Sequence, residues 1–237
     1  MSISTKSQSP VENRLLASLS DEAFARLLPH LKPVSFALGG VVYESSERID
    51  HLYFPTSCIV SLLYTMTDGT TAEMGLVGND GVVGVALFMG GNTVPNRAVA
   101  QVAGDALSVP APALLEEFRR GGPCQLLLLR YTQALITQIS QTAVCNRLHS
   151  VEQRLCRWLL LTHDRVRSAE LLLTQEFIAN MLGGRRESVT KSAGRLQQAG
   201  LIRYVRGHIT ILDRQGLEAA SCECYQVVKT EFDRLLG

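Results

Sequence analysis

The stretch from residue 168 to residue 213 constrains the fold of this chain more than any other. It starts with an apolar pattern of helical spacing that stops at the pair Gly183-Gly184. A second helical pattern follows and ends at Gly200, a favoured C-cap residue. Two alternating apolar and polar runs then flank Gly207-His208, which predicts a β-hairpin about a two-residue turn. Helix, glycine turn, helix and hairpin in this order predict a winged helix-turn-helix.

The predicted second helix, residues 185–199, has a polar and basic N-terminal end. A recognition helix presents this end to base edges in the major groove, where an arginine can hold guanine and a glutamate can accept from cytosine. Hydroxyl groups and the helix N-terminus suit phosphate oxygens, and basic side chains on the hairpin add further donors. The candidate DNA contacts are Arg185, Arg186, Glu187, Ser188, Thr190, Lys191, Arg203, Arg206 and His208. They indicate duplex DNA as the partner; the alternative is a winged helix that serves protein contacts.

The distribution of charge agrees with a DNA partner for the C-terminal part. Residues 1–146 contain 9 Lys and Arg against 12 Asp and Glu, whereas residues 147–237 contain 14 against 10. A hydrophobic fraction of 46% predicts a packed core. The N-terminus is polar, and no apolar run reaches the roughly eighteen residues of a membrane span. We therefore expect a cytoplasmic protein without a membrane partner.

The region between residues 34 and 110 has the texture of a β domain. Short runs rich in Val, Ile, Thr, Tyr and Phe alternate with Gly, Asn, Asp and Pro, which is typical of a compact antiparallel barrel or sandwich. The expected strands are Val41–Tyr43, His51–Phe54, Ile59–Thr65, Thr71–Leu76, Ala98–Ala103 and Ala106–Val109. A helical pattern precedes them at residues 11–31, where Pro33 ends it, and a short helix follows them at residues 113–119.

A long helix without internal Gly or Pro is predicted from about Cys124 to Leu148. Its apolar residues cover more than one face, so we expect it to be buried on two sides. It can pack on the barrel with one face and on a second copy of itself with the other; the alternative is the central core helix of a monomer. Ser150 then serves as the N-cap of a further helix that ends near Val166.

The segment TQEFIANMLGGRRESVTK at residues 174–191, followed by LQQAGLI at residues 196–202, resembles the helix-turn-helix of the Crp/Fnr family. In that family an R-E-x-V-x-R/K pattern reads the operator. The resemblance implies that Arg186, Glu187 and Lys191 read bases and that Thr174 contacts a backbone phosphate. It also implies a homodimer and RNA polymerase as a further partner.

The resemblance covers nearly the whole chain and implies an α+β architecture. We expect an N-terminal antiparallel β-roll, a jelly-roll-like effector domain, over residues 1–122. A dimerisation helix follows at residues 123–148, and the winged helix-turn-helix domain occupies residues 149–237. The expected function is a sequence-specific DNA-binding transcription regulator that reads a two-fold symmetric operator with the helix 185–199. The alternative function is a small-molecule-binding β-roll protein whose winged helix serves protein contacts.

The effector of the expected β-roll cannot be identified from its residues. In the family, a Gly-Glu pair holds the ribose of a cyclic nucleotide, and Arg-Ser or Arg-Thr holds its phosphate. The candidate pocket residues here are Gly84, Val85, Arg97 and Ala98. No acid lies between residues 81 and 91, and Ala98 has no hydroxyl, which argues against cyclic AMP and for another small-molecule effector or none. Residues 1–57 contain no cysteine, which argues against the family's iron–sulfur cluster.

No cofactor, metal site or catalytic site is predicted from the remaining residues. The chain has no P-loop, nucleophile elbow or H-E-x-x-H motif, and Glu73 and Asp80 are interpreted as turn and surface residues. The six cysteines are scattered, and only Cys222 and Cys224 form a close pair. A metal or redox role for that pair is one interpretation. Reduced, buried cysteines are the favoured one, because zinc sites normally combine two such pairs.

Overall fold

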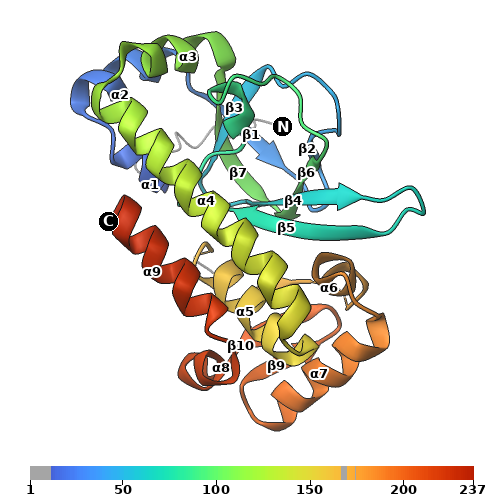
Figure 1. The fold of residues 1–237 in the computed structure, drawn as a ribbon. Coiled ribbons are helices and arrows are strands. Elements are labelled where there is room, and N and C mark those ends of the chain that lie inside the picture. Colours follow the sequence, from blue (N-terminus) through green and yellow to red (C-terminus); the bar gives the residue numbers. More distant parts are fainter. Residues whose placement is uncertain (1–11, 167–169, 174) are drawn as a thin grey trace, which may run out of the picture.

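The computed structural model describes residues 12–166, 170–173 and 175–237, and it divides into an N-terminal β lobe and a C-terminal helical lobe (Figure 1). The β lobe contains α1 (Arg14–Ala17), α2 (Asp21–Leu27), η2 (Leu28–His30), β1 (Lys32–Phe36), β2 (Val41–Tyr43), β3 (His51–Pro55), β4 (Ile59–Thr65), β5 (Thr71–Val77), η3 (Val85–Leu87), β6 (Arg97–Val102), β7 (Gly104–Pro110) and α3 (Ala111–Arg120). The rest of the chain forms α4 (Gly122–Leu148), α5 (Val151–His163), β8 (Glu170–Leu172), α6 (Gln175–Leu182), α7 (Arg186–Gln198), β9 (Ile202–Val205), β10 (His208–Ile211), α8 (Arg214–Ala220) and α9 (Cys224–Leu236).

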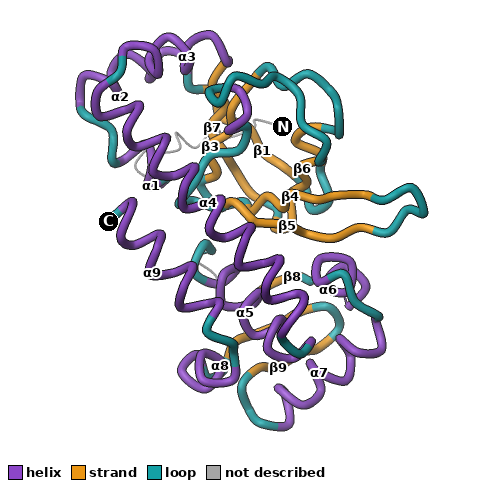
Figure 2. The backbone as a smooth tube through the Cα atoms, viewed as in Figure 1, coloured by secondary structure: helices purple, strands orange, loops and turns teal. Residues whose placement is uncertain are grey.

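The β lobe is an antiparallel roll of two sheets, with strand orders β1-β7-β3 and β2-β6-β4-β5. This confirms the expected fold class, and Figure 2 shows the strands of the roll gathered on one side of α4. Two details differ from the sequence analysis. The predicted helix at residues 11–31 is broken, because Ser18 ends α1 and the Ser20 hydroxyl caps a new helix. Pro33 lies within β1, an edge strand that pairs only with β7, where a missing N–H is tolerated.

Helix α4 joins the two lobes and is covered on part of its surface by α9. The C-terminal helix runs antiparallel to α4, since Phe232 packs edge-on against Tyr131 and Cys222, just before α9, lies beside Cys145 (Figure 1). The sequence analysis predicted neither α8 nor α9. Within the described part of the chain, no helix is both long and apolar enough to cross a membrane.

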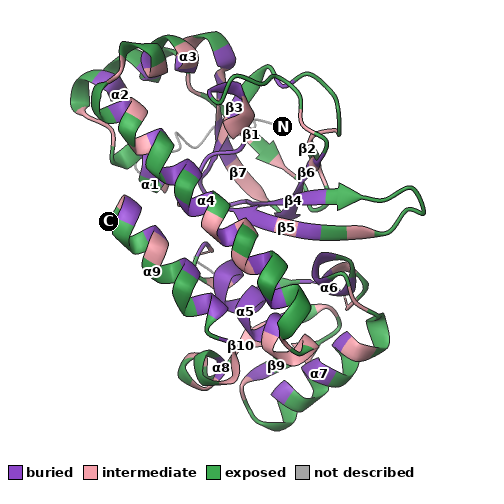
Figure 3. Cartoon of the chain, in the orientation of Figure 1, coloured by how far each residue is buried: buried purple, intermediate pink, exposed green. Residues whose placement is uncertain are grey.

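Helix α5 lies between the lobes and is almost completely buried, as its colour in Figure 3 shows. It begins with the predicted cap: Ser150 Oγ accepts from the Gln153 backbone N–H, and the Gln153 side chain bonds back to Ser150. Its Trp158 Nε1 donates to Glu73 Oε1 on β5 at 3.0 Å. Arg165, just after α5, pairs with Asp80 at 2.8 Å. The interpretation of Glu73 as a turn or surface residue is therefore wrong, because it is buried in β5 and faces a partner 85 residues away in sequence. Asp80 does lie in a turn, but its carboxylate is mostly buried against Arg165.

The contacts around Glu73 can all be satisfied by its neutral form. Ser61 Oγ lies 2.5 Å from both Glu73 Oε2 and Gln101 Oε1, although a hydroxyl has only one proton to donate. A protonated Glu73 satisfies both contacts, because it donates to Ser61 Oγ, which then donates to Gln101. Gln101 Nε2 in turn donates to Thr162 Oγ1 of α5 at 3.0 Å. Burial raises the pKa of the Glu73 carboxyl to about 7, against the opposing effect of its hydrogen bonds.

We predict that this carboxyl makes stability depend on pH. The folded pKa is raised, so its contribution is greatest below the unfolded pKa of about 4.5 and is lost as pH rises through about 7. Glu73→Gln copies the protonated acid and should lose less stability across this window, by on the order of 2–3 kcal/mol. Urea denaturation at about pH 5 and pH 8 measures the difference, with the exposed Glu47→Gln as the control. Equal losses in Glu73→Gln and wild type would contradict the prediction.

Candidate nucleic-acid interface

Helices α6 and α7 form a helix-turn-helix with the predicted glycine turn. Gly183 adopts a positive φ of 56°, and the Gly184 N–H donates to Ala179 O at 3.0 Å, which closes α6. The apolar side of α7, with Val189 and Leu196 fully buried, packs against α5 and α6. The opposite side of α7 is exposed. The predicted recognition helix is therefore confirmed as a helix that presents its polar face to solvent.

The N-terminal end of α7 is cationic and unobstructed. Arg185 is the N-cap residue, with extended φ and ψ and no side-chain hydrogen bond to the helix. Arg186, Glu187 and Lys191 are exposed, and Ser188 is half-buried. No carboxylate among the residues described pairs with Arg185, Arg186 or Lys191. Cations beside free N–H groups at a helix N-terminus can bind anions and base edges.

A hollow of about 330 Å³ separates this end of α7 from the hairpin, and it is lined by Gln175, Arg186, Tyr204, Arg206 and Gly207. Burial raises the pKa of Tyr204, and the charge of Arg186, which lines the same hollow, opposes that rise. The sequence analysis did not identify Gln175 or Tyr204, because their contribution depends on the docking of the hairpin against α7.

Further predicted DNA contacts take part in internal hydrogen bonds or line a second hollow. Thr190 Oγ1 is within 2.8 Å of Gln175 Oε1 and 2.9 Å of Arg186 O, so it ties α7 to α6. Lys191 lines a second hollow of about 260 Å³, together with Ser188 and residues at the start of α5. Thr174, another predicted contact, lies outside the described residues.

The hairpin β9–β10 is a wing whose turn lies one residue earlier than predicted. Arg206 and Gly207 have positive φ of 50° and 85°, as a type I′ turn requires of both central residues. His208 therefore begins β10, and Arg206 occupies the tip of the wing. Arg203 is exposed on β9. β8 adds a third strand, in the order β8-β10-β9.

The candidate effector residues lie in the roll but are bound mostly to other parts of it. Gly84 adopts a φ of 103° and precedes η3, which begins at Val85. Arg97 Nη2 pairs with Glu44 Oε1 at 2.9 Å, so an internal carboxylate holds the cation that was considered for a phosphate. Ala98 is completely buried. Glu44 satisfies one end of the Arg97 guanidinium, while the buried Arg97 Nε has no hydrogen-bond partner among the described residues.

Two family models match the chain. A cyclic nucleotide-binding domain matches residues 33–120, and a Crp-like helix-turn-helix domain matches residues 153–220. No curated protein matches the chain by sequence.

Several solved structures share the whole architecture. FixK2 from Bradyrhizobium japonicum is 16% identical, with a TM-score of 0.68, over 81% of this chain and 98% of that chain. The c-di-GMP responsive global regulator CLP of Xanthomonas campestris is 18% identical, with a TM-score of 0.63, over 81% and 99%. A transcriptional regulator of the CRP/FNR family from Thermus thermophilus is 23% identical, with a TM-score of 0.61, over 80% and 98%. At such identities the likeness establishes the shared fold alone.

The domain order and the fold lead to one assignment. A cyclic nucleotide-binding roll, a long connecting helix and a Crp-like helix-turn-helix follow one another, and the residues that resembled the Crp/Fnr motif form the exposed end of α7. The chain belongs to the Crp/Fnr family of transcription regulators.

Proposed function

We propose that the protein is a homodimeric regulator that binds a specific, two-fold symmetric DNA operator through α7. The observation that carries this proposal is the exposed cationic end of α7 beside the wing, where the described residues offer Arg185, Arg186 and Lys191 no internal ion pair. These side chains can therefore contact phosphates and base edges without first breaking internal salt bridges. Winged-helix surfaces of this charge typically bind duplex DNA.

Within this proposal the residues divide into two roles. Arg186, Glu187 and Lys191 read bases, because the N-terminal turns of a recognition helix enter the major groove. The remaining contacts fix the protein on the phosphate backbone; they are Thr174, Arg185, Ser188, Thr190, Arg203, Arg206 and His208. The alternative, a winged helix that serves protein contacts, predicts no steep dependence of DNA binding on salt.

An apolar stripe on α4 supports the homodimer. The large apolar side chains exposed along this helix are Leu126, Leu129, Ile136, Val144 and Leu148, and most of them recur at spacings of three, four, seven or eight residues. Such a stripe follows one side of a helix, and here α9 and the roll cover other sides of α4. A parallel two-fold pairing of α4 buries it and places two α7 helices for successive major grooves.

The effector of the roll is proposed to be a small molecule other than cyclic AMP. The missing ribose acid and the pairing of Arg97 with Glu44 both weigh against a cyclic nucleotide phosphate at this position. A contact with RNA polymerase is proposed on the family resemblance alone.

We predict that Arg186→Ala weakens operator binding by about 1–3 kcal/mol and relaxes the preference at one guanine position of each half-site. Arg203→Ala on the wing serves as the control; it should weaken binding to all sequences alike and lower the salt slope by about one. Selection from random duplexes with wild type and both variants measures the difference. An unchanged motif for Arg186→Ala, or no symmetric motif for wild type, would show that Arg186 reads no base.

We predict that Ile136→Glu, at the centre of the stripe, converts the dimer to a monomer at micromolar concentration. A two-fold axis brings two copies of the new carboxylate together in an apolar interface, which should raise the dimer Kd by roughly 100-fold or more. Val227→Glu introduces the same charge at an exposed apolar position of α9 and should leave the dimer intact. Sedimentation tests this, and a monomeric wild type that stays monomeric on DNA would refute the dimer.

We predict that cyclic AMP binds weakly or not at all. Each polar group of the ligand that is buried without a partner costs about 1–3 kcal/mol, and both the ribose and the phosphate lack one here. Titration calorimetry on the full chain measures the affinity. A Kd in the micromolar range or tighter would overturn this prediction.

A further inference from the structure

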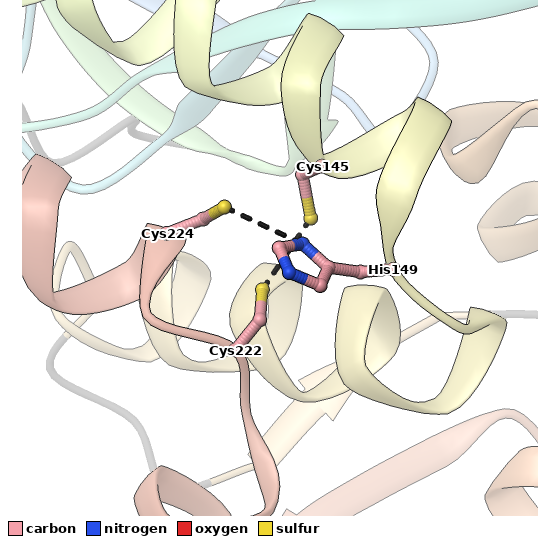
Figure 4. Close-up of side chains that lie close together, drawn as sticks. All are labelled: Cys145, His149, Cys222 and Cys224. Carbon is pink, nitrogen blue, oxygen red and sulfur yellow. Dashed lines mark hydrogen bonds between the residues drawn. The ribbon is translucent and has the colours of Figure 1, made fainter.

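Four potential metal ligands meet where the end of α4 faces the start of α9 (Figure 4). They are Cys145, His149, Cys222 and Cys224, and their ligand atoms all lie within 4.8 Å of one another. The three cysteines also form a small buried cluster separate from the main core. The sequence favoured reduced, buried cysteines, because zinc sites normally combine two close pairs and only Cys222 and Cys224 form one. The fold supplies the missing ligands from more than 70 residues away.

The spacing of these atoms matches one tetrahedral zinc ion. Zn–S bonds of about 2.3 Å place two sulfurs about 3.8 Å apart across a tetrahedron. Cys145 Sγ and Cys222 Sγ are 3.5 Å apart, and Cys224 Sγ is 3.5 Å from His149 Nδ1. A disulfide would need sulfurs at about 2.05 Å. An iron–sulfur cluster spreads its protein ligands over two or more iron atoms and so requires a wider group.

The backbone supplies both halves of the site in ligating positions. Cys145 and His149 are four residues apart, on one side of the last turn of α4, where the His149 N–H donates to Cys145 O. Cys222 and Cys224 lie at the N-terminus of α9, whose free N–H groups and dipole favour thiolates.

The surroundings provide charge and orientation for such an ion. Zinc with three thiolates and a neutral imidazole has a net charge of −1. Arg157 is 4% exposed, and its Nε and Nη1 have no hydrogen-bond partner among the described residues. Its Nη2 donates to Thr142 Oγ1, one turn before Cys145 on the same side of α4. A buried cation that forms no ion pair with a carboxylate of the described residues therefore lies beside the group. On the solvent side, His149 Nε2 is 3.4 Å from Glu223 Oε2, the carboxylate contact that fixes a metal-bound imidazole.

We propose that Cys145, Cys222, Cys224 and His149 Nδ1 bind one structural zinc ion. Four protein ligands leave no open position, so the ion has no catalytic role. Binding releases the thiol protons to solvent and involves no change of oxidation state. The ion cross-links the end of α4 to the start of α9 across the break at residues 149–150. It thereby fixes the C-terminal helix, and with it the helical lobe, on the helix proposed to form the dimer.

The full chain, purified under reducing conditions without chelator, tests this proposal. We expect one zinc per chain by elemental analysis, and replacement by cobalt should produce thiolate-to-metal charge-transfer absorption. Cys224→Ala should lose both signals. Cys124→Ala, at a buried cysteine outside the group, is the matched control and should keep both.

A second variant covers the case in which Cys224→Ala does not fold. Glu223 is 76% exposed on its side chain, so Glu223→Gln should fold normally while weakening zinc binding roughly 10–100-fold in competition with a chromophoric chelator. Folded, reduced wild type that holds no zinc and shows no cobalt absorption would overturn the proposal. So would a Cys145–Cys222 disulfide in the freshly isolated chain, or equal loss of metal in Cys124→Ala. None of these readouts depends on DNA binding.

Discussion

The structure depends on the burial of α5 between the β-roll and the helix-turn-helix. One continuous apolar core includes Leu52 and Leu76 of the roll, Leu159 of α5 and Val189 of α7. A helix buried on both sides cannot stay hydrated, so its polar groups need partners within the protein. Trp158 of α5 donates to Glu73, and the hydrogen bonds of Glu73 continue through Ser61 and Gln101 back to Thr162 of α5. The two lobes are therefore packed as one body, although their family models match separate segments.

Each buried arginine in this interface donates to a carboxylate, a carbonyl or a hydroxyl of the protein. Arg165 pairs with Asp80 and lies over the ring of Phe232, so it joins the roll, α5 and α9 at one point. Arg154 donates to the carbonyl of Leu182 and so satisfies the C-terminal end of α6. Arg186 and Lys191, the exposed cations at the N-terminal end of α7, lack such partners among the described residues, whereas Arg195 further along the helix pairs with Glu152. Arginine thus has two uses in this chain. Buried arginines fix the helix-turn-helix against the rest of the protein, and the exposed arginines at the start of α7 remain available to a ligand.

Local patterns predicted the elements well, and long-range pairings explain what they missed. β2 and β4 have the bounds that the runs rich in β-branched and aromatic residues predicted. The predicted cap at Ser150 is also present. The helix α7 and its exposed charges were predictable because the glycine turn and the charged residues are adjacent in sequence. Glu73 and the cysteine cluster were not, since their partners are distant in sequence and only the packed fold brings them together. An effector site is harder still to predict from sequence, because the sequence does not show that Arg97 pairs with Glu44 in the fold.

These contacts also limit how a change in the roll can reach the helix-turn-helix. The helix-turn-helix touches the roll where α6 meets β5, and Gly183 lies so close that an added Cβ would be 3.5 Å from Ala72. A ligand in the roll can change DNA affinity only if it binds one arrangement of this interface better than another. Coupling of this kind is reciprocal, so DNA must then change the affinity for the ligand by the same factor. The contacts that could differ between two such arrangements are those that β5 makes with α6 and with α5. Both of these helices pack against α7, so they connect the roll directly to it.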